Sequence, residues 1–361
     1  MENRYIGLDL ARALAIIMMV IVNYKLAMEV ESGSAFLLGL TGIFEGRAAA
    51  LFVLLAGIGI AISTNRARRE GKSDLIKQKR LHLIKRGGLL IMLGLCFSLI
   101  WPADILHLYG AYFILAALFI SLTNKQLLIC GVSCLLLFPV LLGLFDYDAG
   151  WHWPSLTYIN FWSVDGFIKQ LFFNGFHPIF PWFSFLLFGL FLGRLNLWDK
   201  QLRKKMLVIA LATFTVLEFG LLVMRGLVSE PGGLLTLAER EELLLVLSSA
   251  MIPPMPQYVI SATCSAVIIL VCCLQLAQSA KHSRIMQWLA KTGRLALSIY
   301  VGHIIIGLGL FELLGILEQP SIAISLVGAL VFIGCCMVFS VWWLKRFNAG
   351  PLEGMFKKLV V

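Results

Sequence analysis

Two residues in the stretch WPADILHLYGAY (101–112) have types and spacing suited to acid–base chemistry. Asp104 and His107 are three residues apart, so on a helix their side chains lie on one face. The carboxylate can then orient the imidazole, and a histidine held in this way is a competent general base. Tyr109 follows as a candidate substrate contact. A purely structural histidine at the end of a membrane span is the alternative interpretation.

The stretch LDLARALAIIMMVIVN (8–23) carries three polar groups in an otherwise apolar run. On a helix, Arg12 lies ~60° from Asp9, and Asn23 returns to within ~20° of Arg12, so all three share one stripe. Two interpretations stay open. Asp9 and Arg12 form an interfacial ion pair while Asn23 bonds to another helix, or the stripe is a polar wall that binds a ligand.

A second buried histidine is expected in TGRLALSIYVGHIIIGLG (292–309). His303 follows Arg294 by nine residues, which places it ~13 Å along a helix and near the middle of a bilayer. Tyr300 precedes it by three residues and shares its face. A histidine at that depth faces the interior of a bundle, either in a hydrogen bond or in a reaction.

Two further stretches contribute candidate binding residues. GFHPIFPWFSFLLFGLFLGR (175–194) presents His177 and Trp182, which are candidate substrate contacts or, alternatively, a helix start and interface anchor. FEGRAAALFVLLAGIGIAI (44–62) opens with Glu45 and Arg47, for which simple snorkelling is the competing interpretation. Its small residues 56–59 would let another helix or a ligand approach closely.

The sequence has no GxSxG elbow, Walker motif, HExxH or CxxC. Without a motif for a covalent nucleophile, direct proton-assisted transfer is the available chemistry. No metal is expected, because no histidine or acid recurs at ligand spacing beside the cysteines.

The elements that position these residues are membrane-spanning helices. The 361 residues are 60% apolar and 14% charged, with apolar runs of about twenty residues. We predict an all-α, polytopic helical bundle forming one domain over residues 1–361. Its ten spans are expected near 6–27, 47–63, 85–101, 104–122, 127–145, 179–195, 206–225, 257–277, 295–316 and 322–344.

The distribution of lysine and arginine predicts orientation. Segment 64–86 has nine Lys/Arg against two acids and is placed in the cytoplasm by the positive-inside rule. The acid-bearing segments 146–176 and 227–256 then lie outside, and both termini are cytoplasmic. The net charge of +10 follows from this rule, with anionic membrane lipids as partners. A nucleic-acid partner is not expected, because the basic residues sit in short loops.

Six motifs carry a resemblance to a known family. LDLARALAIIMMVIVNY, EGRAAALFVLLAGIGIAI, ADILHLYGAYFIL, HPIFPWFSFLLFGLFLGR, TGRLALSIYVGH and the tail GPLEG together resemble the YeiB-like family of bacterial membrane proteins. That family is related to the catalytic region of heparan-alpha-glucosaminide N-acetyltransferase and, more distantly, to the acyltransferase-3 sugar O-acetylases. The resemblance implies a ten- or eleven-helix enzyme that takes an acyl group from cytoplasmic acyl-CoA and delivers it to an acceptor across the membrane.

The resemblance also places two residues in motifs of the related enzymes. Asn23 lies in a VNY similar to that of the glucosaminide acetyltransferases, where the asparagine lines the acyl-CoA site. His303 lies in a YVGH similar to theirs. However, acyltransferase-3 proteins have a histidine where this chain has Asn23, and residues 24–43 lack the catalytic histidine that follows VNY in the glucosaminide acetyltransferases. His107, oriented by Asp104, is therefore our first choice of base.

The expected protein is an acyltransferase of the bacterial inner membrane, with acyl-CoA (acetyl-CoA) as co-substrate and an extracytoplasmic acceptor; a homodimer is left open. Its expected catalytic residues are His107, Asp104 and His303. The expected acyl-CoA contacts are Asp9, Arg12, Asn23, Glu45, Arg47 and Arg294, and the expected substrate contacts are Tyr109, His177, Trp182 and Tyr300. The alternative is a transporter of a small polar or lipid-linked solute: buried charges suit proton coupling, but no internal repeat or matched broken helices are visible.

Overall fold

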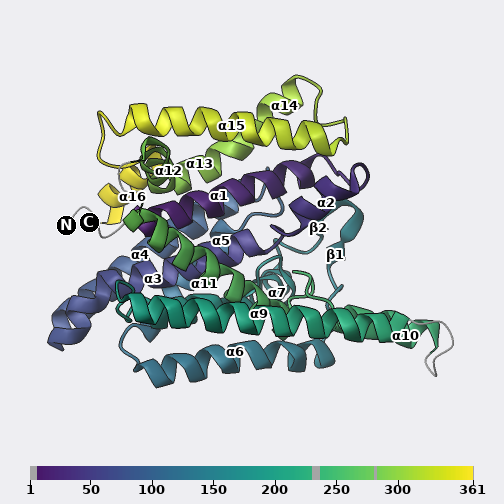
Figure 1. The fold of residues 1–361 in the computed structure, drawn as a ribbon, viewed down its shortest axis with the longest axis horizontal. Helices are drawn as coiled ribbons and strands as arrows, with labels where there is room; N and C mark the ends of the chain where they lie inside the picture. The colour runs from purple at the N-terminus through teal and green to yellow at the C-terminus, as the bar shows by residue number, and fades with distance from the viewer. Residues whose placement is uncertain (1–5, 230–235, 280–282, 361) are drawn as a thin grey trace. The chain divides into compact units, whose positions relative to one another are not determined.

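The computed structural model describes residues 6–229, 236–279 and 283–360 (Figure 1). The predicted outer segment 227–256 and the two chain ends, predicted to be cytoplasmic, therefore fall partly outside the described residues. The chain forms two compact units: Met1–Leu55 with Ile269–Val361, and Ala56–Ile268. The boundaries cut through helices α3 and α11, and each unit is described by itself.

The first unit is built around α1. Asp9 lies in its first turn and Lys25 in its last, so both charges interact favourably with the helix dipole. Helices α12 and α15 pack on α1, and α12 also packs on α15. The elements that begin in this unit are α1 (Ile6–Ala27), α2 (Ala35–Gly42), α3 (Arg47–Glu70), α12 (Arg284–Arg294), α13 (Ala296–Gly302), η4 (His303–Leu308), α14 (Gly309–Leu313), α15 (Ile322–Trp343) and α16 (Pro351–Val360).

Helix α13 begins after a break at Leu295 and is capped by a distant residue. The Glu353 side chain on α16 accepts hydrogen bonds from the backbone N–H groups of Leu297 (2.8 Å) and Ser298 (3.1 Å) through Oε1. Its Oε2 accepts from the Ser298 hydroxyl at 2.5 Å. A helix start leaves such N–H groups without intrahelical partners, so Glu353 satisfies them from another helix. Beyond α13 the chain turns as a π-helix, η4, which starts at His303.

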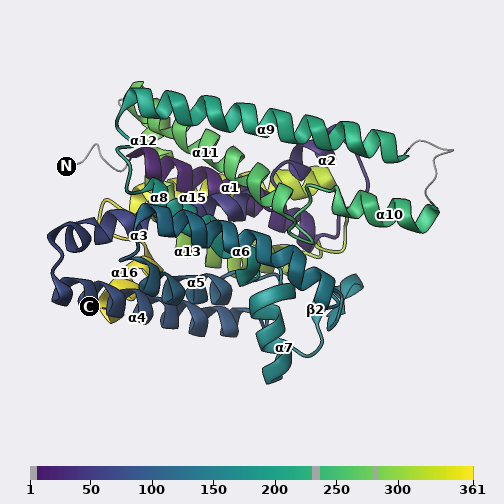
Figure 2. The same cartoon turned by 90° about the horizontal axis from the view of Figure 1, so that it is seen from below.

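The second unit contains two close helix pairs, α4 with α5 and α6 with α8. Figure 2 shows α4 and α5 lying along each other. Glycines permit that approach: a Cβ on Gly87 would lie 2.6 Å from the Gly110 carbonyl oxygen. The elements beginning in this unit are α4 (Ser73–Phe97), α5 (Leu106–Phe119), α6 (Asn124–Leu144), β1 (Trp151–His152), η2 (Trp153–Ser155), β2 (Thr157–Tyr158), α7 (Val164–Lys169), η3 (Gln170–Asn174), α8 (Ile179–Leu192), α9 (Lys200–Ser229), α10 (Leu237–Val246) and α11 (Pro256–Ser279).

The expected close approach to residues 56–59 is present within this unit. A Cβ on Gly57 of α3 would lie 2.2 Å from the Leu186 carbonyl oxygen of α8, so the two backbones nearly touch. The aromatic segment between α6 and α8 forms a short antiparallel ribbon, in which Trp151 pairs with Tyr158. Trp151 stacks on Trp153, with ring centroids 4.7 Å apart.

The fold is helical, as predicted, and the protein is an integral membrane protein. Seven helices in the described part of the chain are long and apolar enough to span a membrane, and a pair bent by 51° (Val164–Asn174 with Ile179–Leu192) makes eight. Every predicted span contains a helix, but α4 is not among the seven, because its first half is rich in charge. Helix α5 has only 14 residues. The predicted count of ten crossings, and the orientation, stay predictions.

Candidate functional site

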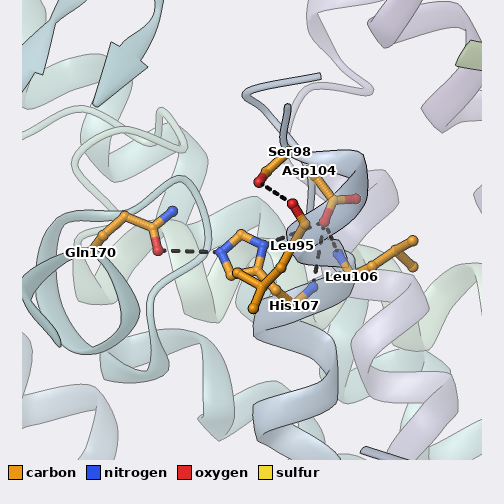
Figure 3. A network of polar contacts seen from close by, with 6 residues as sticks. All are labelled: Leu95, Ser98, Asp104, Leu106, His107 and Gln170. Carbon is orange, nitrogen blue, oxygen red and sulfur yellow. Dashed lines mark hydrogen bonds and ion pairs between the residues drawn. The ribbon is translucent and has the colours of Figure 1, made fainter. Parts of the chain in front are cut away.

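Asp104, His107 and Gln170 form a buried polar network in the second unit (Figure 3). The His107 Nδ1 atom lies 3.3 Å from Asp104 Oδ2, and its Nε2 atom lies 3.3 Å from Gln170 Oε1. Asp104 and His107 are each 1% exposed. The pairing expected from their spacing in the sequence is therefore present, and a third residue joins it.

The start of α5 positions this network. Asp104 Oδ2 also accepts hydrogen bonds from the backbone N–H groups of Leu106 (2.8 Å) and His107 (3.4 Å), so the carboxylate caps the helix as well as holding the imidazole. Gly94 on α4 leaves room for this turn, because a Cβ there would lie 2.2 Å from His107 N and 2.9 Å from Asp104 Oδ2. Asp104 thus both caps the helix and holds the imidazole.

The hydrogen-bond partners of His107 indicate which of its ring nitrogens carries a proton. A carboxylate only accepts hydrogen bonds, so His107 Nδ1 carries a proton. The Gln170 atom that faces Nε2 is the oxygen Oε1, which also only accepts, so in this orientation it suits a proton on Nε2. A lone pair on Nε2 would be satisfied only with the Gln170 amide turned by 180°, so that its nitrogen donates. In the neutral imidazole with Nδ1 protonated, Nε2 is the basic nitrogen, and Gln170 lies beside it.

Gln170 was not among the residues expected from the sequence. It begins the π-helical turn η3, at the bend before α8. Such turns often occur at functional sites because they widen a helix locally and redirect side chains. The available signal was a glutamine within the aromatic run FIKQLFF (167–173).

The expected substrate contacts in this unit line its aromatic core. His177 and Trp182 are buried, with ring centroids 4.4 Å apart at 75°. Their Nδ1 and Nε1 atoms have no hydrogen-bond partner among the described residues. The His177 carbonyl accepts a 2.5 Å hydrogen bond from Tyr112, whose ring in turn contacts Tyr109. Tyr109 and His177 are thus linked through Tyr112.

Asn23 and His303 meet in the first unit. Asn23 Nδ2 lies 2.8 Å from His303 Nε2, and His303 Nδ1 contacts the Tyr300 carbonyl oxygen. A carbonyl only accepts, so Nδ1 carries the proton and Nε2 accepts from the Asn23 amide. His303 is fully buried, whereas Asn23 is partly exposed and keeps a second N–H for another acceptor. The expected hydrogen bond between helices is present, and Tyr300 contributes its backbone as well as its ring.

The remaining expected acyl-CoA contacts lie at both ends of α1. Arg12 Nη1 pairs with Asp9 Oδ1 at 2.6 Å, as the spacing predicted. Arg294 is exposed and donates to the Asn348 carbonyl at 2.9 Å. At the other end, Glu45 pairs with Lys25 at 2.7 Å, a partner that the sequence did not indicate. Arg47 is half-buried at the start of α3.

Two family models match the chain. Residues 4–220, more than half of the chain, match the family described as heparan-alpha-glucosaminide N-acetyltransferase, catalytic. Residues 192–361 match the family described as protein of unknown function (DUF418), which is the YeiB-like family. No curated protein matches the chain significantly. The chain therefore belongs to the family of the heparan-alpha-glucosaminide N-acetyltransferase catalytic domain, and its residues 192–361 are similar to the YeiB-like proteins.

Proposed function

We propose that this protein is a membrane acyltransferase that moves an acyl group, in the first place acetyl, from cytoplasmic acyl-CoA to an extracytoplasmic acceptor. The acceptor supplies a hydroxyl or amine of a glycan, a lipid or a small molecule, and the proposed location is the bacterial inner membrane. One observation carries the proposal: the buried Asp104–His107 pair lies inside the segment that matches the acetyltransferase catalytic family.

His107 is the proposed general base. Asp104 keeps the proton on Nδ1, and the acceptor replaces Gln170 at Nε2. As the acceptor oxygen or nitrogen attacks the thioester carbonyl, its proton passes to Nε2 and a C–O or C–N bond forms. The C–S bond then breaks, and the imidazolium returns the proton to the leaving CoA thiolate.

The proposed acyl-CoA contacts belong to the first unit. The guanidinium groups of Arg12 and Arg294 would bind CoA phosphates, since both remain accessible at the start of α1 and the end of α12. The second N–H of Asn23, which is not used by His303, would donate to a carbonyl oxygen of the ligand. His303 thereby fixes the orientation of the Asn23 amide.

Acyl transfer by purified protein tests the proposal. We expect acetyl-CoA to raise the unfolding temperature in detergent and labelled acetyl to reach acceptors with a hydroxyl or amine. His107→Gln should lower kcat by about 10²–10⁴-fold, the usual contribution of a general base. The matched control is His152→Gln, because His152 is exposed and bonds only locally, to Ser155.

Two results would overturn this function. The first is that acetyl-CoA does not bind to the protein and that His107→Gln leaves any measured acyl transfer unchanged. The second is uptake of a polar solute into proteoliposomes without CoA, which would identify a transporter. Asn23→Leu adds a separate test, because loss of a ligand contact should raise KM for acetyl-CoA more than it lowers kcat.

A further inference from the structure

One end of the first unit carries a dense positive charge, which we call the basic end. It consists of α12 (284–294), the loop 344–350 and α16 (351–360). Figures 1 and 2 both show α12 and α16 at the end of this unit where α1 begins. Helix α15 also ends there, at Trp343. Because α1 and α15 are candidate membrane spans, this end lies at the level where spans leave the bilayer.

The charge on the basic end is almost entirely positive. Every residue of these three segments is described, and they contain one acid, Glu353. Its carboxylate is engaged by the start of α13 and does not neutralise the surface. The seven cations are Arg284, Lys291, Arg294, Lys345, Arg346, Lys357 and Lys358.

Exposed apolar side chains alternate with these cations. In α12, Arg284, Trp288 and Lys291 share one face, and Trp288 is 41% exposed. In α16, Met355 and Leu359 are 45% and 57% exposed and share one face, next to Lys358. Phe347 in the loop and Trp342 at the end of α15 are also exposed. A free aqueous surface would leave these five large groups in water without benefit.

We propose that the basic end binds the anionic headgroups of membrane phospholipids. The cations pair with lipid phosphates, while the apolar and aromatic side chains enter the boundary between headgroups and acyl chains. The position at the end of two spans, the uncompensated charge and the alternating apolar groups together fit this occupant. A nucleic acid or a soluble anion would leave the apolar groups unused. This inference does not depend on the proposed acyl transfer.

The test compares lipids and charge-matched variants in the full-length protein. Purified protein in neutral detergent is titrated with phosphatidylglycerol or phosphatidylcholine, and bound lipid is counted by native mass spectrometry alongside the unfolding temperature. We expect phosphatidylglycerol to bind preferentially. Lys357→Gln/Lys358→Gln should weaken its binding about 30-fold at low salt, roughly fivefold per cation. High salt should reduce this difference.

Control variants separate this surface from general electrostatics. Lys25→Gln/Lys169→Gln removes the same charge, but each of these lysines already has a carboxylate within 2.8 Å, so binding should change less than about threefold. Met355→Gln/Leu359→Gln keeps the charge and should also weaken binding. Equal binding of both lipids, an equal loss in the lysine control, or an equal stabilisation by inorganic phosphate would refute the proposal.

Discussion

Replacing Gly307 with alanine tests how α1 is held against the π-helical turn that carries His303. A Cβ at this position would lie 2.1 Å from the Tyr24 hydroxyl oxygen, far inside normal contact distance. Tyr24 is buried beside Phe311, at a ring distance of 5.2 Å, so its ring has little freedom to move. Since Asn23 precedes Tyr24, a shift of this residue also disturbs the hydrogen bond to His303.

The magnitude follows from two opposing terms. Overpacking of this kind costs about 1–3 kcal/mol, while alanine recovers up to about 1 kcal/mol over glycine in a helix. Tyr24→Phe removes the clashing oxygen, and the nearest remaining atoms are then Phe332 Cδ2 at 3.1 Å and Tyr24 Cζ at 3.2 Å. We therefore expect Gly307→Ala to be destabilising by about 1–2 kcal/mol alone and close to neutral in the Tyr24→Phe background.

A double-mutant cycle measures this coupling. The free energy of unfolding is determined for the four proteins by urea titration in detergent, followed by tryptophan fluorescence. Tyr24→Phe by itself should cost under about 1 kcal/mol, because its hydroxyl makes no hydrogen bond among the described residues. If Gly307→Ala costs the same with and without the Tyr24 hydroxyl, the packing argument is wrong.

Three further predictions concern the same protein. Gly293→Ala places a Cβ 1.9 Å from the Asp9 carbonyl oxygen and should cost about 1–3 kcal/mol of unfolding free energy, whereas Gly302→Ala meets no atom within 4 Å and should be neutral or slightly stabilising. Glu353→Ala should cost about 2–3 kcal/mol in the same titration and Glu353→Gln about half as much, because glutamine keeps one acceptor; equal costs would contradict the capping role. Hydrogen bonds from Thr236 lower the pKa of Glu239 below its ordinary 4.5, so the carboxylate stabilises α10 above that pH and the stability is lost as pH falls. Hydrogen-exchange protection factors of residues 237–246 should accordingly fall as the pH drops below about 4.5, and Glu239→Gln should abolish that dependence.

Contacts between residues close in the sequence were predictable. Asp9 and Arg12 both lie in α1, so helix periodicity sets their pairing. Asp104 also pairs with His107, as expected, but it precedes α5, so the contact forms at a helix cap and not along a helix face. The membrane class and the helical fold follow from apolar runs in the same direct way. The family resemblance was confirmed by the match over residues 4–220, whereas the roles of individual residues remain predictions.

Partners distant in the sequence were not predictable. Asn23 and His303 were each recognised as buried polar groups, but nothing in a single sequence indicates that residues 280 apart form a pair. The π-helical turns at Gln170 and His303 depend on tertiary packing and leave no periodicity of their own. The number of spans is similarly uncertain from composition, because α4 combines a charged first half with an apolar second half.

The cap that Glu353 provides for α13 has a consequence for the order in which the protein is made. The N–H group of Leu297 leaves the ribosome 56 residues before the carboxylate that binds it. Until then the start of this helix has only water or lipid headgroups as partners, and the turn with His303 lacks its final support. A nascent chain that stops short of residue 353 therefore cannot form the capped start of α13. This helix can reach its final structure only after residue 353 has been synthesised.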